Sequence, residues 1–144
     1  MSVPNNILLL DVGNTCIKYA LVDSTGKKHF GVIQKADDLL AMLATVKTCY
    51  ISAVGQKIKV KEIQTVLTDN NIESYHIASQ AAFAGLTCAY QKINKLGVDR
   101  WLAMLACRKQ YAGNFAVLDF GTAMTCDVVN ATGQHLGGWI APMF

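Results

Sequence analysis

The sequence predicts an α/β layer fold that is built from two similar halves. Two observations predict it. Short apolar runs near the N-terminus have the lengths and turn signals of an antiparallel meander, and helix-like and strand-like segments alternate after it. A strand–turn–strand pattern from the meander then returns late in the chain, and internal repetition of this kind indicates a fold with two related halves.

The N-terminal segment is expected to form the meander. Apolar runs at 7–10 and 17–22 flank a short polar segment, and the second run ends in a turn cluster at 23–26. A third strand is expected at 30–33. Together these runs predict three strands, each antiparallel to the one before it.

The segments after the meander alternate between helical and extended patterns. Apolar residues at helical spacing predict helices at 36–46 and 98–111, and a further helix has its apolar face at Val60, Ile63, Val66 and Leu67. Compact apolar runs predict strands at 49–54 and 74–77. We interpret the apolar stripe of the last helix as core packing; it consists of Trp101, Leu102, Leu105 and Ala106.

The repeated pattern begins with the motif Asp-x-Gly at the end of an apolar strand. The motif occurs at Asp11 and again at Asp119. Each copy is followed by a second strand that reaches a Thr-Gly turn, at 25–26 and at 132–133. The aspartates are 108 residues apart and the turns 107, a difference that one loop residue accommodates.

The repeat sets the expected domain organisation. A first half is expected at 1–112 and the start of a second half at 113–144, with a joint at 112–114. The second half is expected to stop after its first β-hairpin, so the chain is expected to be truncated. Of the 144 residues, 52% are hydrophobic and 16% are charged, which is the composition of a globular protein rather than a disordered one.

Composition and charge exclude several classes of protein. The net charge is +3 and the basic residues are dispersed, so no nucleic-acid partner is expected; we interpret Lys57, Lys59 and Lys61 as a solvated helix start. No apolar run approaches the about 20 residues of a membrane span, and the N-terminus lacks a secretory signal, which predicts a cytoplasmic protein. The five cysteines form no CxxC pair and are expected to be reduced.

The two Asp-x-Gly motifs have the chemistry of phosphate loops. Gly13 and Gly121 have no Cβ, so the backbone there can approach phosphate oxygens closely. Asp11 would repel phosphate unless a cation intervenes, which favours Mg²⁺ held through water, and Lys18 can lie close to the phosphate charge. Side-chain donors are available at Asn14, Thr15, Thr122 and Thr125. Alternatively, both motifs are tight hairpin turns with capping aspartates.

The sequence contains neither a P-loop motif nor GxGxxG after a strand. If ATP binds, we expect it to bind between two β-hairpins from two similar halves, as in the actin-like and sugar-kinase ATPases. Four ordered blocks narrow the comparison: Asp-Val-Gly-Asn-Thr at 11–15, Gly-Val-Asp-Arg at 97–100, Asp-Phe-Gly-Thr-Ala at 119–123 and Gly-Gly-x-Ile-x-Pro at 137–142. Across essentially the whole chain they resemble the type III pantothenate kinases, whose homologues are also called Bvg accessory factor proteins. Met143 departs from the family, which tends to have Gly there.

The resemblance implies a ribonuclease H-like fold of the actin-like ATPase type. It also implies a reaction in which ATP phosphorylates pantothenate to 4′-phosphopantothenate, the first step towards coenzyme A, and a homodimer at full length. Asp99 would accept the proton of the substrate hydroxyl, and Asp119 would hold K⁺ or NH₄⁺ near the phosphates. The implied pantothenate contacts are Tyr90, Gly97, Val98, Asp99 and Arg100. The implied ATP contacts are Asp11, Val12, Gly13, Asn14, Thr15, Cys16, Ile17, Lys18 and Thr122. Asp127 and Gly138 are given no direct role.

Alternatives remain for the residues and for the function. Asp99 and Arg100 fit a helix N-terminus with a surface ion pair equally well, and Tyr90 fits an ordinary half-buried aromatic side chain. The alternative functions are a non-catalytic regulatory relative and another small-molecule kinase of the same superfamily, such as a sugar or acetate kinase. The block at 97–100 favours pantothenate over other acceptors, and the presence of Asp11 and Asp99 argues against a non-catalytic relative.

Overall fold

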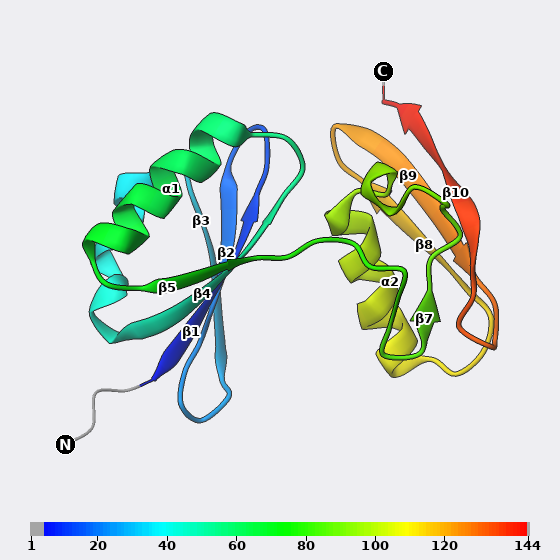
Figure 1. Ribbon diagram of the computed structural model, residues 1–144, viewed down its shortest axis with the longest axis horizontal. Coiled ribbons are helices and arrows are strands. Elements are labelled where there is room, and N and C mark those ends of the chain that lie inside the picture. The colour runs from blue at the N-terminus through cyan, green and yellow to red at the C-terminus, as the bar shows by residue number, and fades with distance from the viewer. Residues whose placement is uncertain (1–4, 144) are drawn as a thin grey trace. The chain divides into compact units, whose positions relative to one another are not determined.

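The computed structural model describes residues 5–143, which divide into two compact units. Unit 1 ends at Ile77 and unit 2 begins at Ala78 (Figure 1). Each unit has a sheet and a hydrophobic core of its own. The domain boundary predicted at 112/113 was based on the sequence repeat, whereas the division at Ile77/Ala78 is one of compactness. The predicted boundary therefore stays a prediction. No helix in the described part of the chain has the length and hydropathy that crossing a membrane requires.

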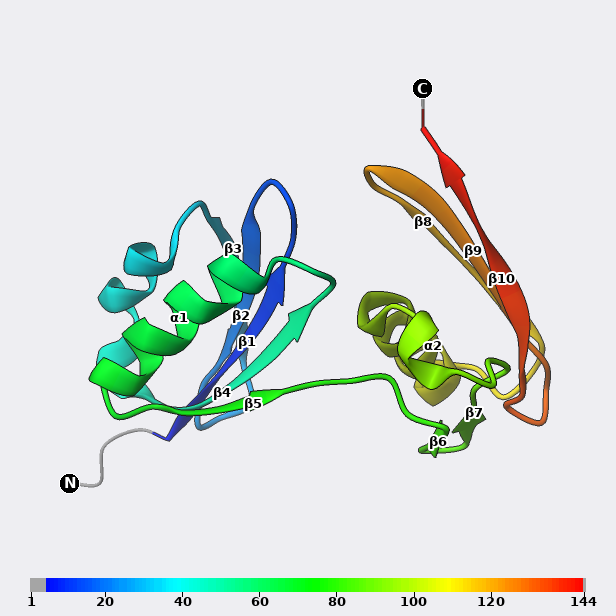
Figure 2. The same ribbon diagram turned by 45° about the horizontal axis from the view of Figure 1, so that its top comes forward.

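Unit 1 consists of β1 (Asn6–Val12), β2 (Ile17–Val22), β3 (Lys28–Ile33), the 3-10 helices η1 (Ala36–Ala41) and η2 (Leu43–Thr45), β4 (Val46–Ala53), α1 (Lys57–Asp69) and β5 (Glu73–His76). Its sheet has the order β3-β2-β1-β4-β5, and the helices lie on one face of it (Figure 2). The first three strands are antiparallel neighbours, whereas β4 is parallel to β1 and β5 is parallel to β4. This order and these directions are those of a ribonuclease H-like fold, so the predicted fold class is confirmed.

The core of unit 1 follows from the two-residue period of its strands. In β1, the side chains of Leu8, Leu10 and Val12 are buried, and the residues between them are exposed. Burying a side chain of this size stabilises the fold by about 1.5–3 kcal/mol. The helices close this core with Leu39, Ile63 and Leu67. Asp11 occupies an exposed position of the alternation, so packing of the core places its carboxylate on the opposite face of the sheet.

The helix predicted at 36–46 is wrong in type and in length. The segment forms two short 3-10 helices, η1 and η2, and Val46 is already the first residue of β4. Val46 belongs to the strand because it lies opposite Asn6 in the parallel ladder of β4 with β1. The strand predicted at 49–54 therefore starts earlier, at Val46. The other predicted elements of unit 1 are confirmed within about two residues at each end.

Unit 2 consists of β6 (Ala82–Phe83), β7 (Leu86–Thr87), the 3-10 helix η3 (Ile93–Lys95), α2 (Val98–Gln110), β8 (Phe115–Phe120), β9 (Ala123–Val129) and β10 (His135–Pro142). The last three strands form an antiparallel sheet in the order β10-β9-β8, so β10 extends the predicted hairpin to a three-stranded meander. The core contains Trp101 and Met104 from α2 and Val129 from β9. Ala106 of the predicted apolar stripe is exposed, and Met104 is buried in its place.

The sequence repeat is matched by the hydrogen bonds of the two Thr-Gly turns. Asp23 Oδ1 accepts hydrogen bonds from the backbone N–H and hydroxyl of Thr25 and from the N–H of Lys27. Asn130 Oδ1 accepts the same three from the residues two and four positions after it. The glycine in each turn has a φ of 84°, a left-handed conformation that favours glycine. In the pairing register, Asp11 lies opposite the residue seven positions later and Asp119 lies opposite the residue six positions later, so the one-residue difference between the two copies falls within these hairpins.

Candidate functional site

The first Asp-x-Gly motif forms the loop between β1 and β2. Asp11 is the last residue but one of β1 and lies opposite Lys18 of β2, and both are exposed. The backbone N–H of Gly13 donates to the carbonyl oxygen of Cys16 over 3.1 Å and closes the loop. A Cβ on Gly13 would lie 3.2 Å from the same oxygen, so a larger residue there would have to move the loop. The two residues at the tip are exposed.

The N-terminal turn of α1 holds this loop. Lys59 Nζ donates to the carbonyl oxygen of Gly13 over 3.0 Å and to that of Asn14, and Gln56 Nε2 donates to Oδ1 of Asn14. Gln56 has a φ of 55°, in the left-handed region that few residues other than glycine adopt. The interpretation of Lys59 as part of a solvated helix start is therefore wrong, because its side chain is partly buried against the loop. The other two lysines of that cluster are exposed.

This loop combines groups that suit a phosphate accompanied by a cation. Lys18 and Lys59 supply positive charge within unit 1, and Asp11 supplies the hard carboxylate oxygens that Mg²⁺ prefers. Among residues 5–143, no group of three or more His, Cys, Asp or Glu side chains is arranged to hold a metal ion. Mg²⁺ commonly binds through one or two carboxylates together with substrate phosphates. The residues present therefore fit an ion that arrives with a phosphate ligand.

The second Asp-x-Gly motif has the same position in unit 2. Asp119 is the last residue but one of β8, and the N–H of Gly121 donates to the carbonyl oxygen of Ala123 over 3.1 Å. The side chains of Asp119 and Thr122 are exposed and have no hydrogen-bond partner among the described residues. The loop thus offers one carboxylate and one hydroxyl to a ligand, which fits the cation and ATP contacts that the resemblance implies.

The implied pantothenate block begins α2. Gly97 is the N-cap residue, Val98 is buried, and Asp99 is exposed in the first turn. Asp99 Oδ1 accepts a hydrogen bond of 2.8 Å from the backbone N–H of Arg100. This bond satisfies one of the N–H groups that a helix leaves unpaired at its N-terminus. The other carboxylate oxygen has no hydrogen-bond partner within the described residues, so Asp99 can stabilise the helix and still face a substrate.

Arg100 is buried and does not form the surface ion pair considered for it. Its Nε donates to Oδ2 of Asp127 over 2.7 Å, and its Nη2 donates to Oδ1 of the same carboxylate over 2.7 Å. The side chains are only 7% and 3% exposed. A buried charge is tolerated when it is paired and hydrogen-bonded in this way. The hydrogen bonds to Asp127 raise the pKa of Arg100, so it remains charged at every relevant pH.

Tyr90 belongs to the same cluster. Its ring stacks on the imidazole of His135, with the ring centroids 5.7 Å apart, and its hydroxyl accepts a hydrogen bond of 3.5 Å from Nη2 of Arg100. The side chain is half-buried against the core of unit 2. The structure therefore brings together two of the implied pantothenate contacts, Tyr90 and Arg100.

Gly138 is required by the close packing around this cluster. A Cβ there would lie 2.3 Å from Oδ1 of Asp127, 2.3 Å from the carbonyl oxygen of Cys126 and 2.4 Å from Nη2 of Arg100. One of the two glycines that begin the block at 137–142 is thus explained, because Gly138 leaves room for the Arg100–Asp127 pair. In the sequence analysis, Gly138 and Asp127 had no direct role and His135 was not singled out.

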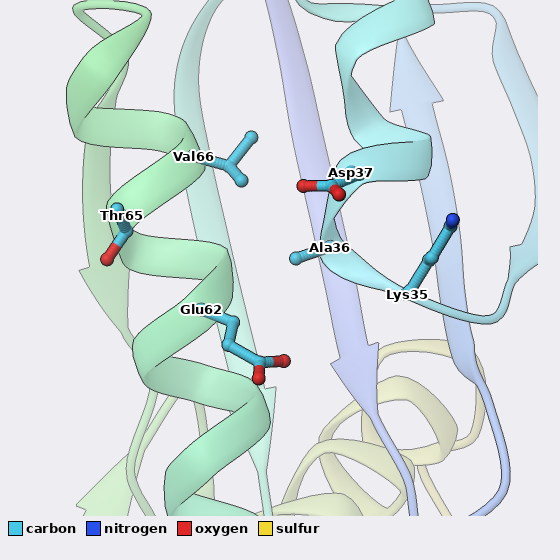
Figure 3. Close-up of a pocket in the computed structure, with 6 residues that line it drawn as sticks. All are labelled: Lys35, Ala36, Asp37, Glu62, Thr65 and Val66. Carbon is cyan, nitrogen blue, oxygen red and sulfur yellow. The ribbon is translucent and has the colours of Figure 1, made fainter.

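A surface cavity in unit 1 is lined by other residues. It has a volume of about 470 Å³, lies between η1 and α1, and is lined by Lys35, Ala36, Asp37, Glu62, Thr65 and Val66 (Figure 3). None of the residues that the sequence assigned to a site is among them. Its carboxylates also make it a poor site for an anion such as a phosphate.

The fold and the repeated hairpins define an α/β protein with a ribonuclease H-like unit and two phosphate-loop candidates. The chain belongs to the type III pantothenate kinase family, because the family model of that description matches residues 7–142. A type III pantothenate kinase from Pseudoalteromonas atlantica is 37% identical over 100% of this chain and 61% of its own length. One from Pseudoalteromonas translucida is 39% identical over 94% of this chain and 55% of its own length.

The chain thus spans little more than half the length of the curated relatives it matches. A solved structure of YeaZ from Pseudomonas aeruginosa is similar over 96% of this chain and 69% of that protein, with a TM-score of 0.45 and 17% identity. The strand order of unit 1, rather than this distant likeness, defines the fold class.

Proposed function

We propose that the two Asp-x-Gly hairpins and the start of α2 form part of an ATP-dependent kinase. This kinase phosphorylates pantothenate, the first step towards coenzyme A. The observation that carries the proposal is the match to the family over residues 7–142, which includes both Asp-x-Gly hairpins and the N-terminal turn of α2. The curated relatives with this name are longer, so the activity proposed is that of a chain of full family length. Such a chain is proposed to act as a homodimer.

The two hairpins are the proposed nucleotide contacts. Residues 11–18 and Thr122 contact ATP, and the closed loop at Gly13 lets the backbone approach the phosphates. Asp11 would hold, through water, the Mg²⁺ that ATP carries, and such an ion would neutralise phosphate charge. Asp119 would hold a monovalent cation, K⁺ or NH₄⁺, near the phosphates. Lys59 adds to this set by keeping the carbonyl groups of the first loop in place.

Asp99 is the proposed proton acceptor. The oxygen of the primary hydroxyl of pantothenate attacks the γ-phosphorus of ATP, the bond between that phosphorus and the β–γ bridging oxygen breaks, and ADP leaves. The hydroxyl proton passes to the carboxylate of Asp99. The proposal is supported by the exposure of this carboxylate and by the backbone N–H that holds one of its oxygens and leaves the other without a hydrogen bond in the described part of the chain. Tyr90, Gly97, Val98 and Arg100 are the proposed contacts that align the substrate.

A coupled assay for ADP release tests this proposal. The full-length protein is incubated with ATP and Mg²⁺, with K⁺ or NH₄⁺ present or absent, and with pantothenate, a panel of sugars or acetate as acceptor. We expect turnover with pantothenate only, an increase with the monovalent cation and loss of turnover with EDTA. Turnover of a sugar or of acetate without turnover of pantothenate would contradict the proposed substrate and favour another kinase of the superfamily.

A further inference from the structure

A buried network in unit 2 involves two residues to which neither the sequence nor the proposed reaction gives a role. Asp127 is 2% exposed and His135 is 1% exposed, and both are hydrogen-bonded to each other. Through them the network reaches Arg100 and Tyr90, which are proposed pantothenate contacts. A buried carboxylate, guanidinium and imidazole are costly to desolvate, so their arrangement requires a physical explanation.

The imidazole of His135 is hydrogen-bonded at both nitrogens. Its Nε2 lies 2.9 Å from Oδ1 of Asp127, and its Nδ1 lies 3.4 Å from the backbone N–H of Ala89. A carboxylate only accepts hydrogen bonds and a backbone N–H only donates them. The neutral ring with its proton on Nε2 satisfies both partners. The ring therefore links the carboxylate of Asp127 to the backbone just before Tyr90 and also stacks on the Tyr90 side chain.

The carboxylate of Asp127 in turn fixes the guanidinium of Arg100. Two of the three guanidinium nitrogens, Nε and Nη2, donate to Asp127. The third, Nη1, has no hydrogen-bond partner among the described residues and is not one of their buried unpartnered atoms, so it remains accessible to a ligand. Because the guanidinium is planar, holding one edge fixes the direction of the remaining nitrogen. A ligand oxygen that meets Nη1 would therefore find a donor whose orientation is already set.

We propose that Asp127 and His135 are positioning residues of the pantothenate site. Asp127 orients Nη1 of Arg100 towards an uncharged oxygen of the substrate, such as a hydroxyl or an amide carbonyl. Because its other edge is taken by Asp127, Arg100 does not grip the substrate carboxylate with two parallel hydrogen bonds. His135 holds the Asp127 carboxylate by a hydrogen bond and the Tyr90 ring by stacking, so it fixes their positions relative to each other. This inference rests on the proposed function, because it assumes that Arg100 and Tyr90 contact pantothenate.

The alternative is that the network only stabilises unit 2, and kinetic constants separate the two roles. A positioning role predicts that variants raise the KM for pantothenate and leave the KM for ATP nearly unchanged. A purely structural role predicts a lower thermal midpoint with unchanged kinetic constants in the folded enzyme. Steady-state kinetics and thermal unfolding of the full-length protein, measured on the same preparations, therefore distinguish them.

Three variants make up the test. In Asp127→Asn the side chain keeps its shape, but an NH2 group replaces one of the two oxygens that accept from Arg100, so one of these hydrogen bonds is lost. We expect the pantothenate KM to rise about ten- to a hundred-fold, the scale of a hydrogen bond to a charged group. His135→Gln keeps an N–H near the position of Nε2, whereas His135→Asn keeps only an acceptor near Nδ1. We therefore expect the Gln variant to be closer to wild type than the Asn variant.

Val129→Ala is the matched control, since Val129 is fully buried in the same strand and core but makes no hydrogen bond in the network. We expect it to lower the thermal midpoint without changing the pantothenate KM. If Asp127→Asn does not fold, the two His135 variants, which leave the Arg100–Asp127 ion pair in place, decide the question. Unchanged pantothenate KM values in the folded variants would overturn the proposal. Failure of the wild-type protein to phosphorylate pantothenate would instead overturn the proposed function on which it rests.

Discussion

Asp99 and Arg100 are adjacent in the sequence but lie in different environments. Asp99 is exposed at the start of α2, whereas Arg100 points into unit 2 and is bound by Asp127. The difference arises because successive residues in the first turn of a helix point about 100° apart. One residue is therefore available to react with a ligand, and the other is fixed by the protein.

The exposed carboxylate of Asp99 gives a residue-scale prediction. Asn stabilises a helix N-terminus about as well as Asp, so Asp99→Asn should barely change the stability of the full-length protein. It cannot take up the proton, so kcat should fall by roughly two to four powers of ten. Pantothenate affinity, measured by calorimetry, should change far less than turnover. Wild-type turnover in this variant would refute the role as base and leave Asp99 a structural residue of α2.

Gly138 gives a second residue-scale prediction. In Gly138→Ala, the new methyl group would overlap both Asp127 and Arg100, so the ion pair would have to separate or β10 would have to move. Overpacking of this kind costs about 1–3 kcal/mol. We expect a lower free energy of unfolding by urea denaturation. Gly113→Ala is the control, because a Cβ there meets nothing within 4 Å. Equal stability of the two variants would contradict the packing role.

At the scale of elements, the loop between β1 and β2 depends on α1. Lys59 and Gln56 lie in the first turn of α1 and just before it, and both donate to loop residues. Two consecutive residues with positive φ, Gly55 and Gln56, join β4 to α1 and bring the start of the helix close to the loop. The conformation of the phosphate-loop candidate is thus set by a helix that lies more than 40 residues away in the sequence.

Substitution of Lys59 tests this dependence. Lys59→Met keeps most of the aliphatic stem but removes the ammonium group, so the carbonyl groups of Gly13 and Asn14 lose their donor. We expect the affinity of the full-length protein for Mg·ATP to fall about ten- to a hundred-fold in calorimetry. Lys61→Met is the matched control, because Lys61 is exposed on the same helix. Equal ATP affinity of the two variants would show that the loop does not need Lys59.

The two Thr-Gly turns allow a pH prediction within one chain. Hydrogen bonds, first from the hydroxyl of Thr25, lower the pKa of Asp23 from 3.8 to about 2. A carboxyl whose pKa is lower in the folded state stabilises the fold above its unfolded pKa, and this stabilisation is lost as the pH falls from about 4 to about 2. Asp23→Asn gives this turn the residue found at Asn130 in the other.

We therefore expect Asp23→Asn to lose less stability than wild type between pH 4 and pH 2, as measured by urea unfolding at each pH. NMR titration of the Asp23 carboxyl in the wild-type chain measures the pKa directly. A titration midpoint near the ordinary value of an aspartate would contradict the proposed hydrogen bonding.

At the scale of the whole molecule, unit 2 presents an exposed apolar surface. The face of the β8–β9–β10 sheet turned away from Asp127 exposes large apolar side chains, those of Leu118, Phe120 and Trp139. Exposed apolar patches commonly contact other protein segments. The chain also spans only 55–61% of the length of two curated relatives.

We therefore predict that the 144-residue chain alone has little or no kinase activity. It contains both hairpins and Asp99, but phosphoryl transfer requires a site that excludes water and aligns both substrates. ADP release with pantothenate, compared at equal molar concentration with a full-length protein carrying this sequence, measures the difference. Turnover within a few-fold of the full-length rate would contradict the prediction.

The sequence alone determined the local features of this protein. The Asp-x-Gly motifs, the Thr-Gly turns and the period of the strands depend on residues within a few positions of one another, so strand–turn–strand patterns and the two copies of the repeat were readable from spacing. The same local rules placed Asp11 and Asp119 at the ends of strands and Asp99 at the start of a helix.

The tertiary structure decided which polar side chains meet across long stretches of sequence. Lys59 approaches a loop 46 residues earlier, and Arg100 binds a carboxylate 27 residues later. Val46 begins a strand rather than ending a helix because β4 pairs with β1, a partner 40 residues earlier that no local pattern encodes. Hydrogen bonds and burial depend on distance in space. Spacing along the sequence predicts that distance only for residues in the same helix turn or in a local strand pair.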